Sequence, residues 1–126
     1  MTSRTTAFLV TSIGGAVTLA AAPAPVHACT ISGDWRITQS NGAVVDLSVV
    51  QSGDRLEGAA RRDSITGSLY GRIIRRKVAF FIQWGGRTTG EYRGRIDPDG
   101  RLHGHSIDLA KHTSQAIWFA NTHFRC

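Results

Sequence analysis

From residue 29 onward, hydrophobic and polar residues alternate along most of the chain. Val78, Phe80, Ile82 and Trp84 occupy every second position of one segment, so in a strand they would share one face. The segment Glu91–Asp97 alternates in the same way, with charged residues between its apolar ones. No window sustains the spacing of about 3.6 residues that marks an amphipathic helix. The pattern therefore predicts short β-strands throughout this part of the chain.

Turn-forming residues interrupt the alternation at regular intervals. Glycine, asparagine, aspartate, proline and serine gather at these points because each favours a turn geometry. The seven turn signals are Ser40–Gly42, Ser52–Asp54, Arg62–Ser64, Arg75–Lys77, Gly85–Gly86, Asp97–Gly100 and Lys111–Ser114. They divide residues 29–126 into eight segments of strand length, which is typical of an antiparallel β-meander.

A large apolar residue followed two positions later by glycine recurs along these segments. The five instances are Leu56 and Gly58, Ile65 and Gly67, Leu69 and Gly71, Tyr92 and Gly94, and Leu102 and Gly104. Such alternation suits the curved wall of a small closed barrel, because glycine lets a strand bend. Closure also removes the open sheet edges that would otherwise need protection. We therefore predict an all-β fold, an eight-stranded antiparallel up-and-down β-barrel, with a β-sandwich as the alternative.

The first 28 residues have the features of a cleavable signal peptide. Arg4 is the only Arg, Lys, Asp or Glu among them, and an apolar stretch and a run of small residues lead to a cleavage point before Cys29. A membrane anchor would need about 20 apolar residues, more than this stretch offers. The chain thus divides into a signal peptide, residues 1–28, and a β-barrel domain, residues 29–126. This predicts a secreted or extracytoplasmic protein.

The only two cysteines, Cys29 and Cys126, would be the first and last residues of the exported domain. In an oxidising compartment an even number of cysteines usually forms disulfides, and two cysteines allow a single pairing. We predict a structural disulfide between them. The alternative is a lipoprotein acylated at Cys29, which would exclude that disulfide.

The chain carries a net charge of +6, with 15 lysines and arginines against 9 acidic residues. The excess is concentrated between Arg61 and Arg101. A solvated basic surface is one interpretation, and attraction to lipid headgroups, a cell-wall polymer or an acidic protein is the functional one. We expect no nucleic-acid partner, because the basic residues are not interleaved with aromatic ones in a known binding motif.

Gly33-Asp34-Trp35 resembles the Gly-x-Trp opening of the calycin barrels, the group that includes lipocalins and avidins. Further segments resemble successive avidin strands: Leu56–Gly58 the third, Phe81–Trp84 the fifth, Thr88–Gly94 the sixth and Trp118–Phe124 the last. The resemblance covers nearly all of residues 29–126. It implies a barrel that holds a small ligand in its mouth.

The resemblance does not extend to the groups with which avidins bind biotin. After the first strand the chain reads Ile37–Asn41, without the Asn and Ser that receive the ureido group. Ala59–Arg61 replaces a Tyr-x-Ser, and Thr122 replaces an acid on the last strand. Because a buried polar group without a hydrogen-bond partner costs about 1–3 kcal/mol, we do not expect tight biotin binding.

Six residues form the predicted lining of the mouth. They are Trp35, Trp84, Tyr92, Asp108, Trp118 and Thr122. Trp84, Tyr92, Trp118 and Thr122 follow from the resemblance, whereas the other two lie on inward faces by alternation. Asp108 is the one acid on an otherwise inward face, and the indole N–H of Trp118 is its expected hydrogen-bond donor.

The last two segments bring three histidines together if their turn centres on Thr113. His103 then faces His123, and His105 points the same way as His103. Three imidazoles can bind zinc, so these are the candidate metal ligands. No carboxylate motif accompanies them, and we predict no metal and no other cofactor. Apolar residues on the same face of the hairpin, such as Phe119, predict a homo-oligomer contact.

No catalytic constellation is present, neither a nucleophile elbow, nor a phosphate loop, nor a zinc-protease motif, so we predict no enzyme. The predicted function is a secreted β-barrel that binds a small apolar or amphipathic ligand in its mouth. The alternative is a secreted inhibitor or interaction protein that uses its loops or a basic face, with the barrel as scaffold. Small bacterial protease-inhibitor barrels are similar in size, Gly-x-Trp opening and export.

Overall fold

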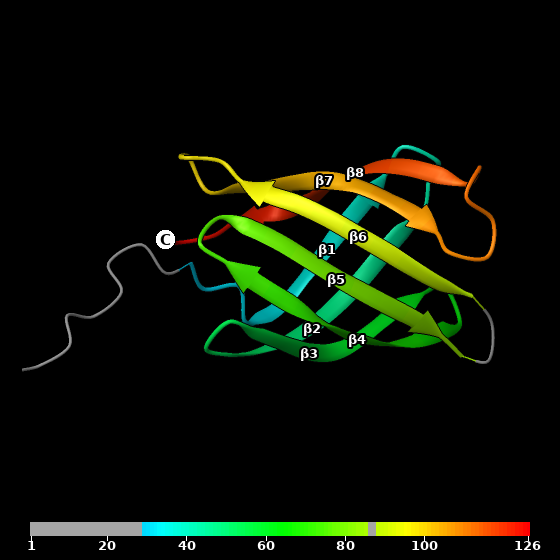
Figure 1. Ribbon diagram of the computed structural model, residues 1–126, viewed down its shortest axis with the longest axis horizontal. Coiled ribbons are helices and arrows are strands. Elements are labelled where there is room, and N and C mark those ends of the chain that lie inside the picture. The colour runs from blue at the N-terminus through cyan, green and yellow to red at the C-terminus, as the bar shows by residue number, and fades with distance from the viewer. Residues whose placement is uncertain (1–28, 86–87) are drawn as a thin grey trace, which may run out of the picture.

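The computed structural model describes residues 29–85 and 88–126, which form a closed β-barrel (Figure 1). Its strands are β1 (Gly33–Gln39), β2 (Val44–Ser52), β3 (Arg55–Arg62), β4 (Ile65–Ile74), β5 (Lys77–Trp84), β6 (Thr89–Ile96), β7 (Arg101–Asp108) and β8 (Gln115–His123). Each strand pairs antiparallel with the next, and β1 also pairs with β8. The predicted up-and-down barrel is confirmed, and the β-sandwich alternative is wrong.

Part of the chain lies outside the described residues. The predicted signal peptide, residues 1–28, lies outside the described residues, and so do two residues of the β5–β6 turn. Within the described ranges, no helix has the length and hydropathy needed to cross a bilayer.

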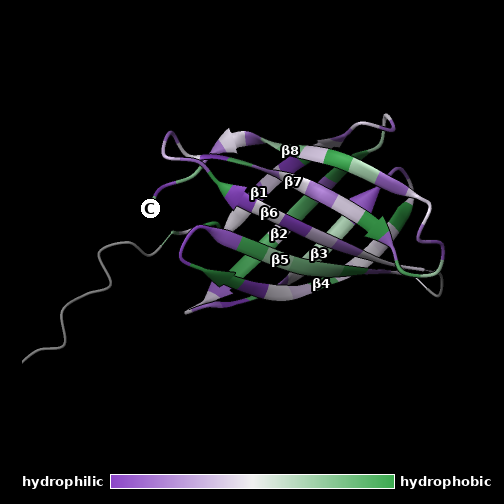
Figure 2. Cartoon of the chain, turned by 45° about the horizontal axis from the view of Figure 1, so that its top comes forward, coloured by the Kyte–Doolittle hydropathy of each residue, from purple (hydrophilic) through white to green (hydrophobic). Residues whose placement is uncertain are grey.

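Alternate side chains of every strand fill the barrel. Figure 2 shows hydrophobic and hydrophilic positions following one another along the strands. Phe80 stacks on Tyr92 with 5.1 Å between ring centroids, and its centroid lies 5.9 Å from that of Trp118. Phe80 and Trp118 are almost completely buried. An eight-stranded barrel is only just wide enough for such side chains, so its middle is a packed core.

Several strand glycines stand where the neighbouring strand leaves no room for a side chain. Gly94 of β6 pairs directly with Gly104 of β7. A Cβ atom at Gly94 would lie 2.6 Å from the carbonyl oxygen of His103 and 2.8 Å from Cη2 of Trp118. These separations are shorter than carbon atoms tolerate, so no larger residue fits without movement of the wall or the core. The recurring apolar-x-Gly step therefore reflects the tight curvature of the barrel.

The segment before β1 seals one end of the barrel, which we call the closed end. A disulfide joins Cys29 to Cys126, as predicted. The backbone N–H of Ile31 donates to Oε1 of Gln51 at 2.8 Å, and Nε2 of Gln51 donates to the carbonyl of Cys29 at 2.9 Å. The indole of Trp35 donates to the carbonyl of Ile31 at 2.9 Å. Ile31 is fully buried, so this segment acts as a plug.

The register of β7 and β8 differs from the prediction. His103 pairs with Phe119 and not with His123, a displacement of four residues along β8 (123 against 119). The turn centres nearer Lys111 than expected, because Oδ1 of Asp108 accepts a hydrogen bond from the N–H of Lys111 at 3.3 Å and ends β7 there. Since the displacement is an even number of residues, the same side chains still face the core.

Candidate functional site

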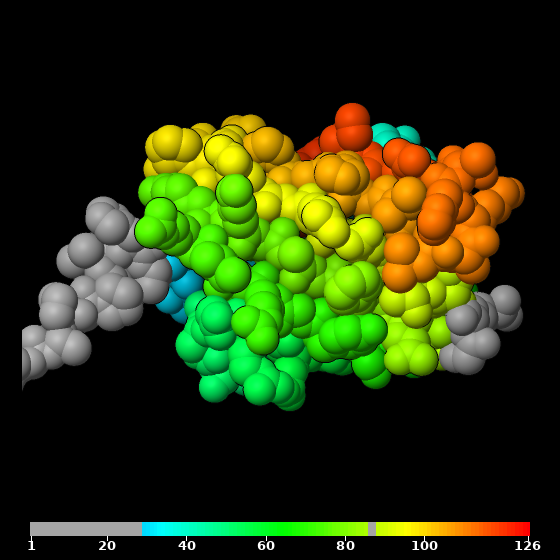
Figure 3. Space-filling view, viewed as in Figure 1, coloured from blue at the N-terminus to red at the C-terminus, as the bar shows by residue number. Residues whose placement is uncertain are grey.

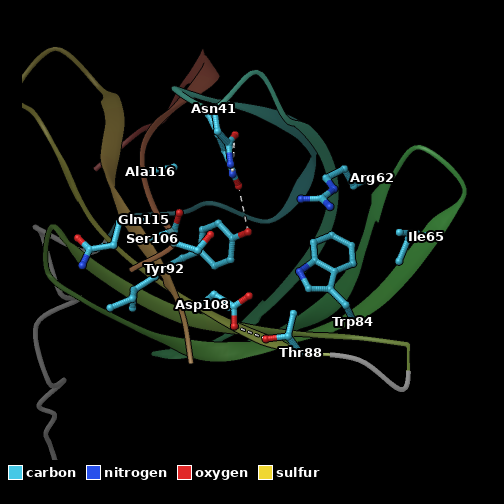
Figure 4. A pocket seen from close by; sticks show the side chains of 14 residues that line it. Asn41, Arg62, Ile65, Trp84, Thr88, Tyr92, Ser106, Asp108, Gln115 and Ala116 are labelled. Atoms are coloured by element: carbon cyan, nitrogen blue, oxygen red, sulfur yellow. Dashed lines mark hydrogen bonds between the residues drawn. The ribbon is translucent and has the colours of Figure 1, made fainter. Parts of the chain in front are cut away.

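The end of the barrel opposite the disulfide holds a cavity of about 220 Å³, which we call the mouth pocket (Figure 4). It lies where β1, β3, β5 and β7 end and where β4, β6 and β8 begin. Its aromatic and polar side chains are Gln39, Asn41, Arg62, Trp84, Thr88, Tyr92, Ser106, Asp108, Ser114 and Gln115. The pocket therefore combines flat apolar surfaces with hydrogen-bonding groups.

Tyr92 anchors a hydrogen-bonded chain that runs from the core to the rim. Its hydroxyl donates to Oε1 of Gln39 at 3.0 Å, and Nε2 of Gln39 donates to Oδ1 of Asn41 at 3.2 Å. The backbone N–H of Ala43 also donates to that oxygen, at 3.0 Å. Burial raises the pKa of Tyr92 to about 12, although the charge of Arg62 acts in the opposite direction. The phenol is neutral at physiological pH, and its oxygen can still accept a hydrogen bond.

Asp108 supplies a carboxylate on the β7 side of the pocket. Its Oδ1 accepts hydrogen bonds from the hydroxyl of Thr88, from the N–H of Ala110 at 2.8 Å and from the N–H of Lys111 at 3.3 Å. These bonds, above all the one from Thr88, lower the pKa of the Asp108 carboxyl. The predicted bond from Trp118 is wrong: Nε1 of Trp118 is buried with no partner among the described residues. Oδ2 of Asp108 faces the pocket (Figure 4).

Arg62 supplies the opposite charge. Its Cζ lies 5.9 Å from the centroid of the Trp84 ring, which is the geometry of a cation–π contact. Arg62 forms no ion pair with a carboxylate of the described residues. Figure 4 shows its guanidinium beside Trp84 and the Asp108 carboxylate on another side of the pocket. The mouth pocket thus offers a cation and an anion, separated and both available to a ligand.

The six predicted ligand-binding residues fall in three different places. Three of them line the mouth pocket: Trp84, Tyr92 and Asp108. Trp118 is fully buried in the core, with its ring centroid 6.1 Å from that of Tyr92. Trp35 and Thr122 lie together at the closed end. A ligand in the mouth pocket would therefore contact the first three and leave the other three untouched.

Several polar residues of the pocket were not singled out from the sequence. They are Gln39, Asn41, Arg62, Thr88, Ser106, Ser114 and Gln115. A usable signal was present for some of them. Gln39 continues the inward series of Trp35 and Ile37, and Arg62 follows buried Ala60 by the same two-residue step. A polar residue that extends an inward apolar series to the end of a strand faces the mouth of a barrel.

The three candidate metal ligands are not brought together. His103 lies on the outer face, with Nε2 3.1 Å from both carboxylate oxygens of Asp97. His105 pairs with Ile117, and His123 pairs with a residue at the start of β7. In the part of the chain that the structure describes, no three histidine, cysteine or acidic side chains are grouped as a metal site. Ile117 is 67% exposed, and a homo-oligomer contact through this hairpin stays a prediction.

Comparison of the chain with protein-family models, with curated proteins and with solved structures finds no match in any of the three. The architecture rests on the strand pairing itself, which is antiparallel and closed through eight strands. The kind of ligand that the mouth pocket could bind is inferred from the side chains that line it.

Proposed function

We propose that this protein is an exported binding protein that holds one small amphipathic molecule in the mouth pocket. The observation that carries the proposal is the convergence of aromatic and charged side chains on the open end of a barrel whose middle is filled. The avidin-like resemblance supports the same location for a ligand. Tight biotin binding is not proposed, because the segments Ile37–Asn41 and Ala59–Arg61 lack the biotin-binding groups of avidins.

The size of the pocket limits the ligand. A cavity of about 220 Å³ is smaller than the roughly 300–1,000 Å³ of pockets that hold drug-sized molecules. The ring of Trp84 and the side chain of Ile65 form part of its apolar wall. A molecule with a single ring and one short polar arm fits this space, whereas a long lipid chain would meet the packed core.

The charges of the pocket select the polar groups of the ligand. Oδ2 of Asp108 can accept a hydrogen bond from an N–H or O–H group. The guanidinium of Arg62 can donate to a carbonyl or carboxylate oxygen. Because the two charges offset each other, a zwitterion or a cyclic amide matches the pocket better than a simple cation or anion.

Tryptophan fluorescence tests this proposal directly. Of the three tryptophans, Trp84 lines the mouth pocket, Trp118 lies in the core and Trp35 at the closed end. Titration with a panel of single-ring amides, ureas and amino acids should give a saturable change in the wild type and in Trp35→Phe. The change should disappear in Trp84→Phe, provided that circular dichroism shows the variant to be folded.

Calorimetry with the same ligand then tests the two charges. Arg62→Gln and Asp108→Asn should each weaken binding about tenfold or more, as expected for a lost hydrogen bond to a charged group. Arg36→Gln removes an exposed cation from the outer face of β1 and should leave the affinity unchanged. A panel without any saturable response, or a response that survives in Trp84→Phe and vanishes in Trp35→Phe, would contradict a ligand site at the mouth.

A secreted interaction protein that uses the barrel as a scaffold is the second candidate. The observation that favours it is a groove on the outer face of β4–β7 that basic side chains line without any aspartate or glutamate. In that case the partner would bind more weakly as salt rises. Its affinity would not depend on Trp84, which lies in the mouth pocket.

A further inference from the structure

The outer face of β4–β7 carries a groove of about 550 Å³. Figure 3 shows this side of the molecule, with the side chains of β4–β6 in green and yellow. The basic and histidine residues that line the groove are Arg72, Lys77, Arg93, Arg95, His103 and His105. Its lining residues, all of which the structure describes, include no aspartate or glutamate. We call it the basic groove.

Strand register creates a hollow in the middle of the basic groove. Ala79 of β5 pairs directly with Arg72 of β4 on one side and with Arg93 of β6 on the other. Two residues earlier on β5, Lys77 pairs with Arg95. Neighbouring strands lie about 4.8 Å apart, so Arg72 and Arg93 flank the methyl group of Ala79. Lys77 and Arg95 lie two residues further along the same face. The short side chain of Ala79 therefore leaves a space bordered by cations.

Little within the protein neutralises this hollow. Arg72 lies 3.8 Å from Asp54 in an exposed pair, whereas Arg93 donates two hydrogen bonds to Oε2 of Glu91, whose side chain is 21% exposed. Both acids lie outside the groove. An exposed ion pair such as Arg72–Asp54 contributes about 0–1 kcal/mol, so an incoming anion can compete with it. The other two cations of the hollow have no carboxylate within ion-pair distance in residues 29–85 and 88–126.

We propose that the basic groove binds a linear phosphate polymer, with one phosphate group seated over Ala79. Three of the four cations are arginines, whose planar guanidinium groups bind phosphate oxygens in pairs. Each inner phosphate of such a polymer has two non-bridging oxygens that share one negative charge, so it can accept hydrogen bonds from two or more of these cations. Further phosphates of the same chain would lie along the rest of the groove.

The shape of the surface favours a chain over a lipid bilayer. The groove spans four of the eight strands of a closed barrel, so its walls follow a curve. A flexible polymer can follow that curve, whereas a flat bilayer would touch only part of it. Ile74, at 56% exposure, is the one large apolar side chain exposed in the groove, too little for membrane insertion. No aromatic ring lines the groove, so it offers no surface on which nucleic-acid bases could stack.

Binding of fluorescently labelled long-chain inorganic polyphosphate to the purified protein tests the proposal. Lys77→Gln combined with Arg95→Gln should weaken binding about 25-fold, a factor of about five for each cation. The matched control is Arg36→Gln combined with Arg61→Gln, which removes the same charge from β1 and β3, outside the groove. The control should bind as the wild type does.

A second pair of variants distinguishes binding in the hollow from attraction by the net charge of the protein. Ala79→Glu places a carboxylate among the cations and should abolish binding, whereas the isosteric Ala79→Gln should retain part of it. Both point to solvent, so circular dichroism should show unchanged folds. Equal losses in the two double variants would overturn the proposal, because net charge alone would explain binding. Equal affinity for polyglutamate, or binding to phosphatidylglycerol vesicles without binding to polyphosphate, would overturn it as well.

Discussion

Tyr92 combines packing, hydrogen bonding and burial at a single position. It is only 5% exposed, and its ring stacks on Phe80. Its hydroxyl donates a hydrogen bond to Gln39, which a phenolate could not do. Because burial removes water from the phenol, it favours the neutral form and raises the pKa of Tyr92 from 10.0 to about 12.

Alkaline pH should destabilise the fold through Tyr92. Between pH 10 and about 12 the unfolded chain loses this proton and the folded chain keeps it, so stability falls as pH rises. The full loss of stability is on the order of 2–3 kcal/mol for a shift of about two pKa units.

Urea unfolding at steps between about pH 8 and pH 11.5 should show a shallower decline in stability for Tyr92→Phe than for the wild type. Tyr70→Phe, at an exposed position on β4, is the matched control. Parallel declines in Tyr92→Phe and the wild type would refute the effect.

At the scale of elements, the close contact of β6 and β7 depends on paired glycines. Gly94 faces Gly104, and the ring of Trp118 fills the space inside the barrel where a side chain on Gly94 would lie. The barrel curves sharply here because two neighbouring strands lack side chains on their inner faces at the same level. The contact thus links the curvature of the wall to the packing of Trp118 in the core.

Substitution of Gly94 by alanine should destabilise the protein by about 1–3 kcal/mol, the usual effect of overpacking. The added methyl group would meet the His103 carbonyl at 2.6 Å. Gly85→Ala is the control, because a Cβ there comes no closer than 3.4 Å to another residue. Thermal and urea unfolding of both variants measures the difference. Equal stability of the two variants would show that the wall adjusts freely at Gly94.

At the scale of the whole molecule, the two ends of the barrel differ in construction. The closed end is plugged by Ile31 and tied by the Cys29–Cys126 disulfide, which spans a sequence separation of 97 residues. The open end holds the mouth pocket. The mouth pocket therefore lies at the end opposite the covalent link, and the disulfide can act on stability without contributing to the pocket.

Loss of the disulfide should lower the free energy of unfolding by roughly 4–5 kcal/mol, the chain-entropy value for a loop of this length. The double variant Cys29→Ser with Cys126→Ser provides the test, with urea unfolding as the measurement. Reduced wild-type protein should unfold at the same urea concentration as the variant. Equal stability of the oxidised and reduced wild type would show that the link contributes nothing to the fold.

The sequence by itself determined the strands and their inner faces. Period-two alternation is a local property, and it placed Val78, Phe80, Ile82 and Tyr92 on inner faces without knowledge of their neighbours. The position of the two cysteines at the ends of the domain predicted their pairing, which the structure confirms. The same alternation, continued to the strand ends, would have identified Gln39 and Arg62 as pocket residues.

Only the tertiary structure decided how far along the barrel each inward residue lies. Trp35 and Trp84 both face inward, but one lies at the closed end and the other at the open end. His103 pairs with Phe119 and not with His123 because the position of the turn between β7 and β8 sets the register of the two strands. Side-chain direction follows from two-residue periodicity within one strand, whereas height and partner depend on the stagger between strands, which is a property of the closed sheet.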